Sequence, residues 1–98
     1  MTRQDAIAAL KQQASALKAL GATELYLFGS TVRDDAVLKS DLDLFIDYDR
    51  GSRFSLVELV GVKQLLERRL GVQVDVTTRD SLGPLLKDRI EASAERVF

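Results

Sequence analysis

The chain has 98 residues, enough for a single domain, and carries a net charge of −1 with 30% charged residues. It contains neither cysteine nor histidine, which excludes disulfides, thiolate and imidazole metal sites, and Ser-His-Asp catalysis. Any metal must therefore bind oxygen ligands, which favours Mg²⁺ or Mn²⁺. No apolar run approaches the roughly 20 residues of a membrane span and no signal peptide is visible, so we expect a cytoplasmic protein.

The chain is expected to begin with a helix and a short strand. Apolar residues at three- and four-residue spacing predict an amphipathic helix over residues 3–20, with Gly21 as its stop. Residues 24–28 then read as a strand that ends at Gly29. A glycine directly after a strand permits a tight turn.

A second strand is expected after a turn or one short helical segment at residues 31–38. Residues 41–48 alternate between two kinds of side chain, which predicts a strand with one buried aliphatic face. The aliphatic face holds Leu42, Leu44, Ile46 and Tyr48, and the opposite face holds Asp41, Asp43, Phe45 and Asp47.

A long helix is predicted next, because Ser55 and Glu58 form a capping-box signature. It runs to about Leu70, and Gly71 stops it. Its expected inner face consists of Leu56, Leu59, Val60, Leu66 and Leu70.

The last third predicts a strand, a helix and a short edge strand. Residues 72–77 form the strand, with valines inward and Asp75 on the polar face. Asp80 or Ser81 is expected to cap a helix through about Ala92 with Pro84 in its first turn, and residues 96–98 can add an edge strand. The order αβ(α)βαβα describes one α+β domain over residues 1–98.

Three aspartates are candidate metal ligands. Asp41 and Asp43 should lie about 6.6 Å apart on one strand face, where their carboxylates can converge on two divalent ions roughly 3.5–4 Å apart. If the two Asp-bearing strands are neighbours, Asp75 points into the same cleft and can also accept a proton. Each aspartate taken alone fits a solvated strand surface equally well or better.

Gly29 and Ser30 are candidate phosphate contacts, because a glycine after a strand leaves backbone amides free and serine adds a hydroxyl donor. Arg33 could reach a triphosphate or pair with Asp34 or Asp35. The turn is not a Walker A loop, because it lacks the Gly-Lys-Ser/Thr ending.

The ordered set of Gly29-Ser30, a ten-residue gap, Asp41-Leu42-Asp43 and the later Asp75 resembles the minimal nucleotidyltransferases of the DNA polymerase β superfamily, over residues 24–92. The resemblance implies a mixed β-sheet backed by helices, with ATP and Mg²⁺ (or Mn²⁺) as donor and cofactor. It also implies that Asp41 and Asp43 bind both metals, Asp75 completes the catalytic metal site, and Gly29 and Ser30 hold the β- and γ-phosphates.

Members of this size are similar to antitoxins of two-gene modules whose other product is a HEPN ribonuclease toxin. The resemblance therefore implies AMP transfer to a tyrosine of a HEPN partner, without direct nucleic-acid or membrane contact. Asp34 stands where many relatives have glycine, so neutralisation of a toxin by binding alone is an alternative hypothesis. Nucleotidyl transfer to a small molecule is a further alternative, disfavoured because such enzymes generally need added acceptor-binding structure.

Overall fold

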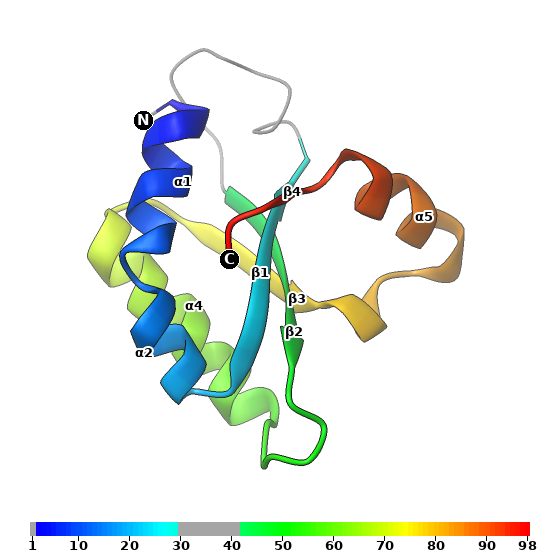
Figure 1. The fold of residues 1–98 in the computed structure, drawn as a ribbon, viewed down its shortest axis with the longest axis horizontal. Helices are drawn as coiled ribbons and strands as arrows, with labels where there is room; N and C mark the ends of the chain where they lie inside the picture. Colours follow the sequence, from blue (N-terminus) through cyan, green and yellow to red (C-terminus); the bar gives the residue numbers. More distant parts are fainter. Residues whose placement is uncertain (1, 30–41) are drawn as a thin grey trace.

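The computed structural model describes residues 2–29 and 42–98 (Figure 1). The expected α+β class is confirmed, whereas the segment predicted at residues 31–38 lies outside the described residues. The described elements are α1 (Arg3–Lys11), α2 (Ala14–Ala19), β1 (Ala22–Phe28), β2 (Leu42–Tyr48), α4 (Leu56–Leu70), β3 (Val74–Thr78), the 3₁₀ helix η1 (Arg79–Ser81), α5 (Pro84–Ser93) and β4 (Glu95–Arg96).

The four strands form one mixed sheet in the order β3-β2-β1-β4. The β1 strand pairs antiparallel with both β2 and β4, whereas β2 and β3 run parallel, so α4 serves as the crossover between them. The mixed sheet backed by helices that the resemblance implied is therefore present.

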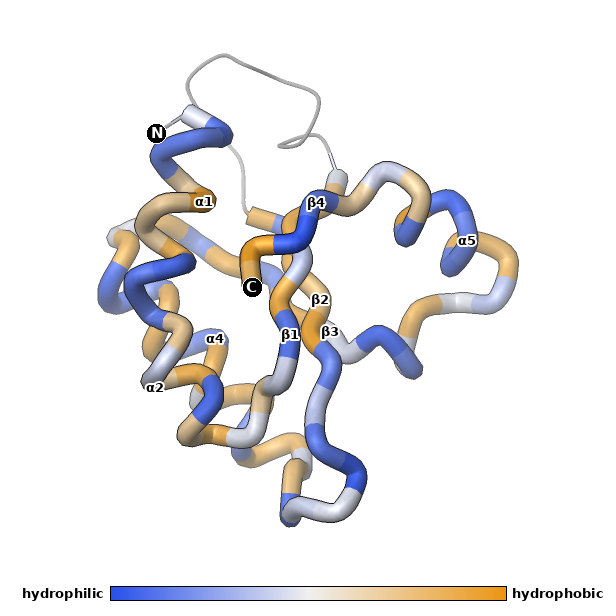
Figure 2. The backbone as a smooth tube through the Cα atoms, viewed as in Figure 1, coloured by the Kyte–Doolittle hydropathy of each residue, from blue (hydrophilic) through white to orange (hydrophobic). Residues whose placement is uncertain are grey.

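The sheet has one face buried by helices and one face that is more polar. Helices α1, α2 and α4 cover the first face and α5 stands on the other side (Figure 1). The first face carries the fully buried leucines of β1 and the aliphatic residues of β2, packed against Leu10, Leu17, Val62 and Leu66 of the helices. Hydrophobic residues recur along the central strands, whereas the turn after β2 is hydrophilic (Figure 2). No helix within the described ranges is both long and apolar enough to cross a membrane.

The single helix predicted over residues 3–20 is instead two helices. A capping box between Thr2 and Asp5 starts α1, and the chain then tightens where the Gln13 amide donates to the Leu10 carbonyl. The apolar spacing continues across this break and no glycine or proline marks it, so the sequence pattern could not reveal it. Gly21, with φ of 111°, ends α2 as expected.

The predicted start and end of α4 are confirmed. Ser55 and Glu58 form the capping box, and Gly71 ends the helix in the left-handed conformation. The predicted inner face is wrong at Leu56 and Val60, which are 72% and 42% exposed. Leu66 is buried as predicted, and Leu59 and Leu70 pack partly buried against the core. Val62, which was not assigned to the inner face, is also buried, so the contact stripe is rotated slightly from the predicted one.

The predicted helix cap at Asp80 or Ser81 is wrong. These residues belong to η1, and α5 begins at Pro84 after Gly83. The Asp80 carboxylate accepts hydrogen bonds from Thr78 and Tyr48, so it is engaged outside the helix. Pro84 does occupy the first turn of α5, as the sequence indicated.

The edge strand expected at residues 96–98 lies close to its predicted place, as β4. Residues Glu95 and Arg96 pair with β1, and backbone hydrogen bonds join Leu25 to Val97 and Phe98 beyond the strand. This contact ties the C-terminal segment to the centre of the sheet.

A single arginine links α5 to the sheet. Arg79 donates from Nε to both carboxylate oxygens of Asp47, at 2.9 and 3.0 Å, and from its terminal nitrogen to Glu91 of α5. Its guanidinium also lies over the rings of Tyr26 and Phe45, at 4.7 and 5.1 Å from their centroids. Because α5, which is described throughout, buries none of its residues, this polar contact contributes much of its attachment.

Glu91→Gln tests this attachment. The Arg79 and Glu91 side chains are 25% and 30% exposed, so we expect a loss of about 0.5–1 kcal/mol after solvent screening. Hydrogen exchange of the amides of residues 84–93 should accelerate several-fold while the amides of β1 and β2 keep their rates. Asp88→Asn, an exposed change on the same helix, is the matched control. Equal acceleration in both variants would contradict the role of Arg79.

Candidate functional site

Three of the six predicted site residues lie within the described ranges. These are Gly29, Asp43 and Asp75; the other three, Ser30, Arg33 and Asp41, lie outside the described residues. The structure therefore describes the first residue of the candidate phosphate turn and two of the three candidate metal ligands. Their mutual geometry can be built from the sheet.

The two described aspartates face each other across neighbouring strands. In the parallel register of β2 and β3, Asp43 is the partner of Asp75. Partners in adjacent strands lie about 4.8 Å apart and project from the same face of a sheet, so both carboxylates belong to one surface. Asp43 is half-buried and Asp75 is exposed, while the intervening Leu44 and Val76 turn toward the helices.

Gly29 abuts the Asp43 carboxylate. Its φ is +83°, a conformation that favours glycine, and a Cβ at this position would lie 2.5 Å from Oδ2 of Asp43. Because Phe28 is the antiparallel partner of Asp43, the register of β1 and β2 itself brings the turn to the carboxylate. A side chain at position 29 would displace the carboxylate.

The donor set suits a hard divalent cation. The chain offers no imidazole or thiolate, and the paired groups are carboxylates, which are preferred ligands of Mg²⁺ and Mn²⁺. No cluster of three acidic side chains able to hold a metal occurs among the described residues, which do not include Asp41. The two described aspartates therefore fit part of a metal site.

Aromatic rings continue this face of the sheet away from the aspartates. Phe45, fully buried, stacks on Tyr26 with centroids 4.7 Å apart and contacts Phe28 at 5.7 Å. Arg79 closes this cluster, and its hydrogen bond with Asp47 raises the pKa of its guanidinium. The Tyr26 hydroxyl donates to Glu24, which raises the tyrosine pKa.

Arg79 was not among the predicted site residues. Its partners Asp47 and Glu91 are 32 and 12 positions away, so no local pattern announces them. Only the pairing of strands brings these groups together.

A cavity of about 480 Å³ opens beside Gly29. The turn side contributes Phe28 and Gly29, and the α5 side contributes Leu86, Arg89, Ile90 and Ser93. The cavity therefore adjoins the glycine that contacts the Asp43 carboxylate. Arg89 was not among the predicted site residues, because nothing in the sequence places α5 beside the end of β1.

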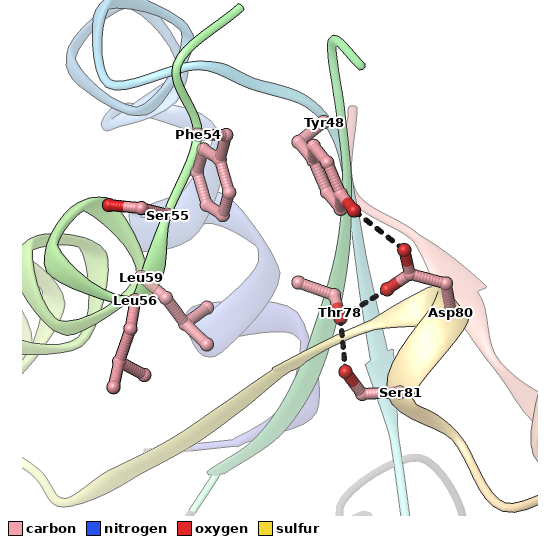
Figure 3. Close-up of a pocket in the computed structure, with 8 residues that line it drawn as sticks. All are labelled: Tyr48, Phe54, Ser55, Leu56, Leu59, Thr78, Asp80 and Ser81. Atoms are coloured by element: carbon pink, nitrogen blue, oxygen red, sulfur yellow. Dashed lines mark hydrogen bonds between the residues drawn. The ribbon is translucent and has the colours of Figure 1, made fainter.

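A second cavity, of about 470 Å³, lies at the opposite end of β2 (Figure 3). Tyr48 is five residues beyond Asp43, which along a strand is about 16 Å. The rings of Tyr48 and Phe54 stack with centroids 4.9 Å apart, and Leu56 and Leu59 form the wall from α4 (Figure 3). None of the predicted site residues lines this cavity within the described ranges.

A hydroxyl network holds the acidic wall of that second cavity. The Asp80 carboxylate accepts from the Thr78 and Tyr48 hydroxyls, each at 2.6 Å, and these bonds hold its pKa below the ordinary value (Figure 3). The hydrogen bond to Asp80 raises the pKa of the Tyr48 hydroxyl. Asp80 is thus ionised near neutral pH and already satisfied by its neighbours.

Comparison with known proteins identifies the family and the fold. Residues 10–97 match the family model described as a nucleotidyltransferase domain. The chain belongs to the nucleotidyltransferase domain family. The sequence-based prediction of a nucleotidyltransferase is confirmed.

Among curated relatives, a candidate protein adenylyltransferase of Methanocaldococcus jannaschii is 43% identical over 70 residues, which are 71% of this chain and 73% of that protein. Further relatives are matched over 61–66% of their own lengths. The similarity therefore covers most of this chain but leaves about a third of several relatives unmatched.

Solved structures share the fold. A candidate minimal nucleotidyltransferase aligns with a TM-score of 0.81 and 30% identity over 97% of this chain and 95% of its own. A chain of the complex between the tri-AMPylated HEPN toxin of Shewanella oneidensis and an MNT antitoxin aligns with a TM-score of 0.65 and 16% identity, over 99% of this chain and 72% of that chain. At that identity the second likeness concerns the fold alone.

Gly29→Ala tests the close approach of the turn to Asp43, and Gly71→Ala is its matched control. Both glycines have positive φ, but a Cβ at Gly71 meets nothing within 4 Å. We expect Gly71→Ala to lower the free energy of unfolding by about 1–2 kcal/mol through backbone strain alone. Gly29→Ala should cost about 1–3 kcal/mol more because the Asp43 carboxylate must move. Equal losses of unfolding free energy for Gly29→Ala and Gly71→Ala, measured by urea denaturation, would contradict the close approach of Gly29 to Asp43.

Divalent metal binding can be read from thermal stability. At ten times its Kd, Mn²⁺ should stabilise the protein by about 1.4 kcal/mol, which raises Tm by about 6–11 °C for a chain of this size. Asp75→Asn should remove most of this increase and leave Tm without metal unchanged or higher, because like charges in facing positions repel. Asp88→Asn is the control, and chelation with EDTA should reverse the increase. A full Mn²⁺ effect in Asp75→Asn would exclude Asp75 as a ligand.

Proposed function

We propose that this chain transfers AMP from ATP to a tyrosine hydroxyl of a HEPN ribonuclease toxin, and so acts as the antitoxin of that toxin. Mg²⁺, or Mn²⁺ in its place, is the cofactor. With ATP as donor, the reaction would take place in the cytoplasm. The proposal includes no nucleic-acid or membrane partner.

The observation that carries this proposal is the placement of Asp43 opposite Asp75 with Gly29 against the Asp43 carboxylate. Two carboxylates on neighbouring strands and a glycine at their edge supply an anionic surface suited to divalent metal ions. Asp41, which precedes β2 in the sequence, is assigned as a further metal ligand, and Ser30 and Arg33 as further contacts to the phosphates. Metal ions held by these aspartates would neutralise the triphosphate and lower the pKa of the attacking hydroxyl.

The reaction balances with these groups. The acceptor oxygen forms a bond to the α-phosphorus of ATP, the bond from that phosphorus to the bridging oxygen breaks, and pyrophosphate leaves with the bonding electrons. The acceptor's proton passes to the Asp75 carboxylate, which is exposed and therefore accessible. Gly29 and Ser30 orient the β- and γ-phosphates, which keeps the leaving group in line with the attacking oxygen.

The relatives support the acceptor class. The similar protein of M. jannaschii is a candidate protein adenylyltransferase, and the fold recurs in a complex whose HEPN toxin carries three AMP groups. A protein hydroxyl is therefore favoured over a small-molecule acceptor.

Incubation with α-labelled ATP, Mg²⁺ and the product of the adjacent gene tests the proposal. The wild-type chain should label that product on tyrosine, and Asp43→Asn or Asp75→Asn should reduce the rate by about 10³-fold or more, since each removes a carboxylate from the reacting centre. Asp88→Asn should label at the wild-type rate.

Two outcomes would contradict this function. Absence of transfer by the wild type with either Mg²⁺ or Mn²⁺ would exclude the enzymatic activity. If Asp43→Asn transfers nothing and still protects cells from the toxin as fully as the wild type, neutralisation occurs by binding alone.

A further inference from the structure

One side of α5 forms a wall of the cavity beside Gly29. Leu86, Arg89, Ile90 and Ser93 recur at three- and four-residue intervals, so they share one side of the helix. All four line the cavity, and Phe28 and Gly29 close it from β1. Figure 1 shows the C-terminal part of α5 near the C-terminal end of β1.

The orientation of α5 is fixed by its polar link to the sheet. Glu91 is held by Arg79, which is itself bound to Asp47 of β2. Positions 89 and 91 are about 200° apart around a helix, so Arg89 lies on a different side from the anchored glutamate. The anchor therefore presents Arg89 to the cavity rather than to the sheet.

Arg89 carries an unneutralised positive charge at this place. Its side chain forms no ion pair with any residue in the described ranges, in contrast to Arg79, which has two carboxylate partners. A guanidinium without a carboxylate partner retains all of its donors for a ligand. It is the one basic side chain that the described residues contribute to this cavity.

Groups of opposite charge thus lie on the two sides of Gly29. Asp43 and Asp75 lie on the sheet side, and Arg89 lies on the α5 side of the cavity that adjoins Gly29. A polyphosphate with bound divalent ions matches this arrangement, because its metals pair with the carboxylates and its remaining negative oxygens pair with the guanidinium.

We infer that Arg89 binds the outer phosphates of the nucleotide donor and so stabilises the pyrophosphate that leaves. This inference deepens the proposed function and rests on it. The apolar residues Leu86 and Ile90 line the cavity beside Arg89.

Binding of Mg²⁺-tripolyphosphate, measured by calorimetry, tests the inference without requiring catalysis. Arg89→Ala should lower the affinity for tripolyphosphate and for ATP by about tenfold or more, which is the usual effect of losing a charged hydrogen bond. The affinity for AMP should change by less than about twofold. The tripolyphosphate affinity of Arg89→Lys should lie between those of the wild type and Arg89→Ala, since lysine keeps the charge but lacks the planar set of donors. Lys87→Ala, which removes a charge from the same helix outside the cavity lining, should resemble the wild type.

Each outcome is decisive. Unchanged tripolyphosphate binding by Arg89→Ala, equal losses for AMP and ATP, or no binding of tripolyphosphate by the wild type would overturn the inference. If the wild type binds tripolyphosphate through Arg89 but transfers AMP to no protein, the phosphate-binding role of Arg89 is supported. In that case the proposed AMP transfer is contradicted. Circular dichroism melts of Arg89→Ala should match the wild type, because Arg89 is exposed.

Discussion

The parallel pairing of β2 with β3 is the constraint on which the site depends. It places Asp43 opposite Asp75 and turns Leu44 and Val76 toward the helices at the same time. A slip of one residue would carry Asp75 to the helix-covered face and a valine to the polar face. The buried aliphatic residues therefore hold the two carboxylates in register, since any other register would expose the core.

The site itself opposes stability. Two carboxylates face each other, and a glycine with positive φ lies against one of them. Such arrangements persist where the surrounding structure determines them strongly, as the fully buried leucines of β1 and β2 do here. Under the proposed function, the close approach of Gly29 to Asp43 would link the phosphate position to the metal position.

The two faces of the sheet are held by different forces. Helices α1, α2 and α4 pack on one face through buried aliphatic side chains, whereas α5 is attached to the other through Arg79 and its carboxylate partners. The cavity that Arg89 lines lies on this second side, between α5 and the end of β1.

The sequence by itself determined the class of fold, the capping of α4 and the alternation of β2, because these follow from local spacing. The sequence pattern placed the exposed Leu56 and Val60 on the inner face of α4 and gave no sign of the break between α1 and α2. It also assigned Asp80 to a helix cap, whereas Asp80 lies in η1. Only the tertiary structure decided that Asp75 faces Asp43, that Arg79 joins three elements and that Arg89 lies beside Gly29. Each of these depends on contacts between residues far apart in the chain, for which local periodicity carries no information.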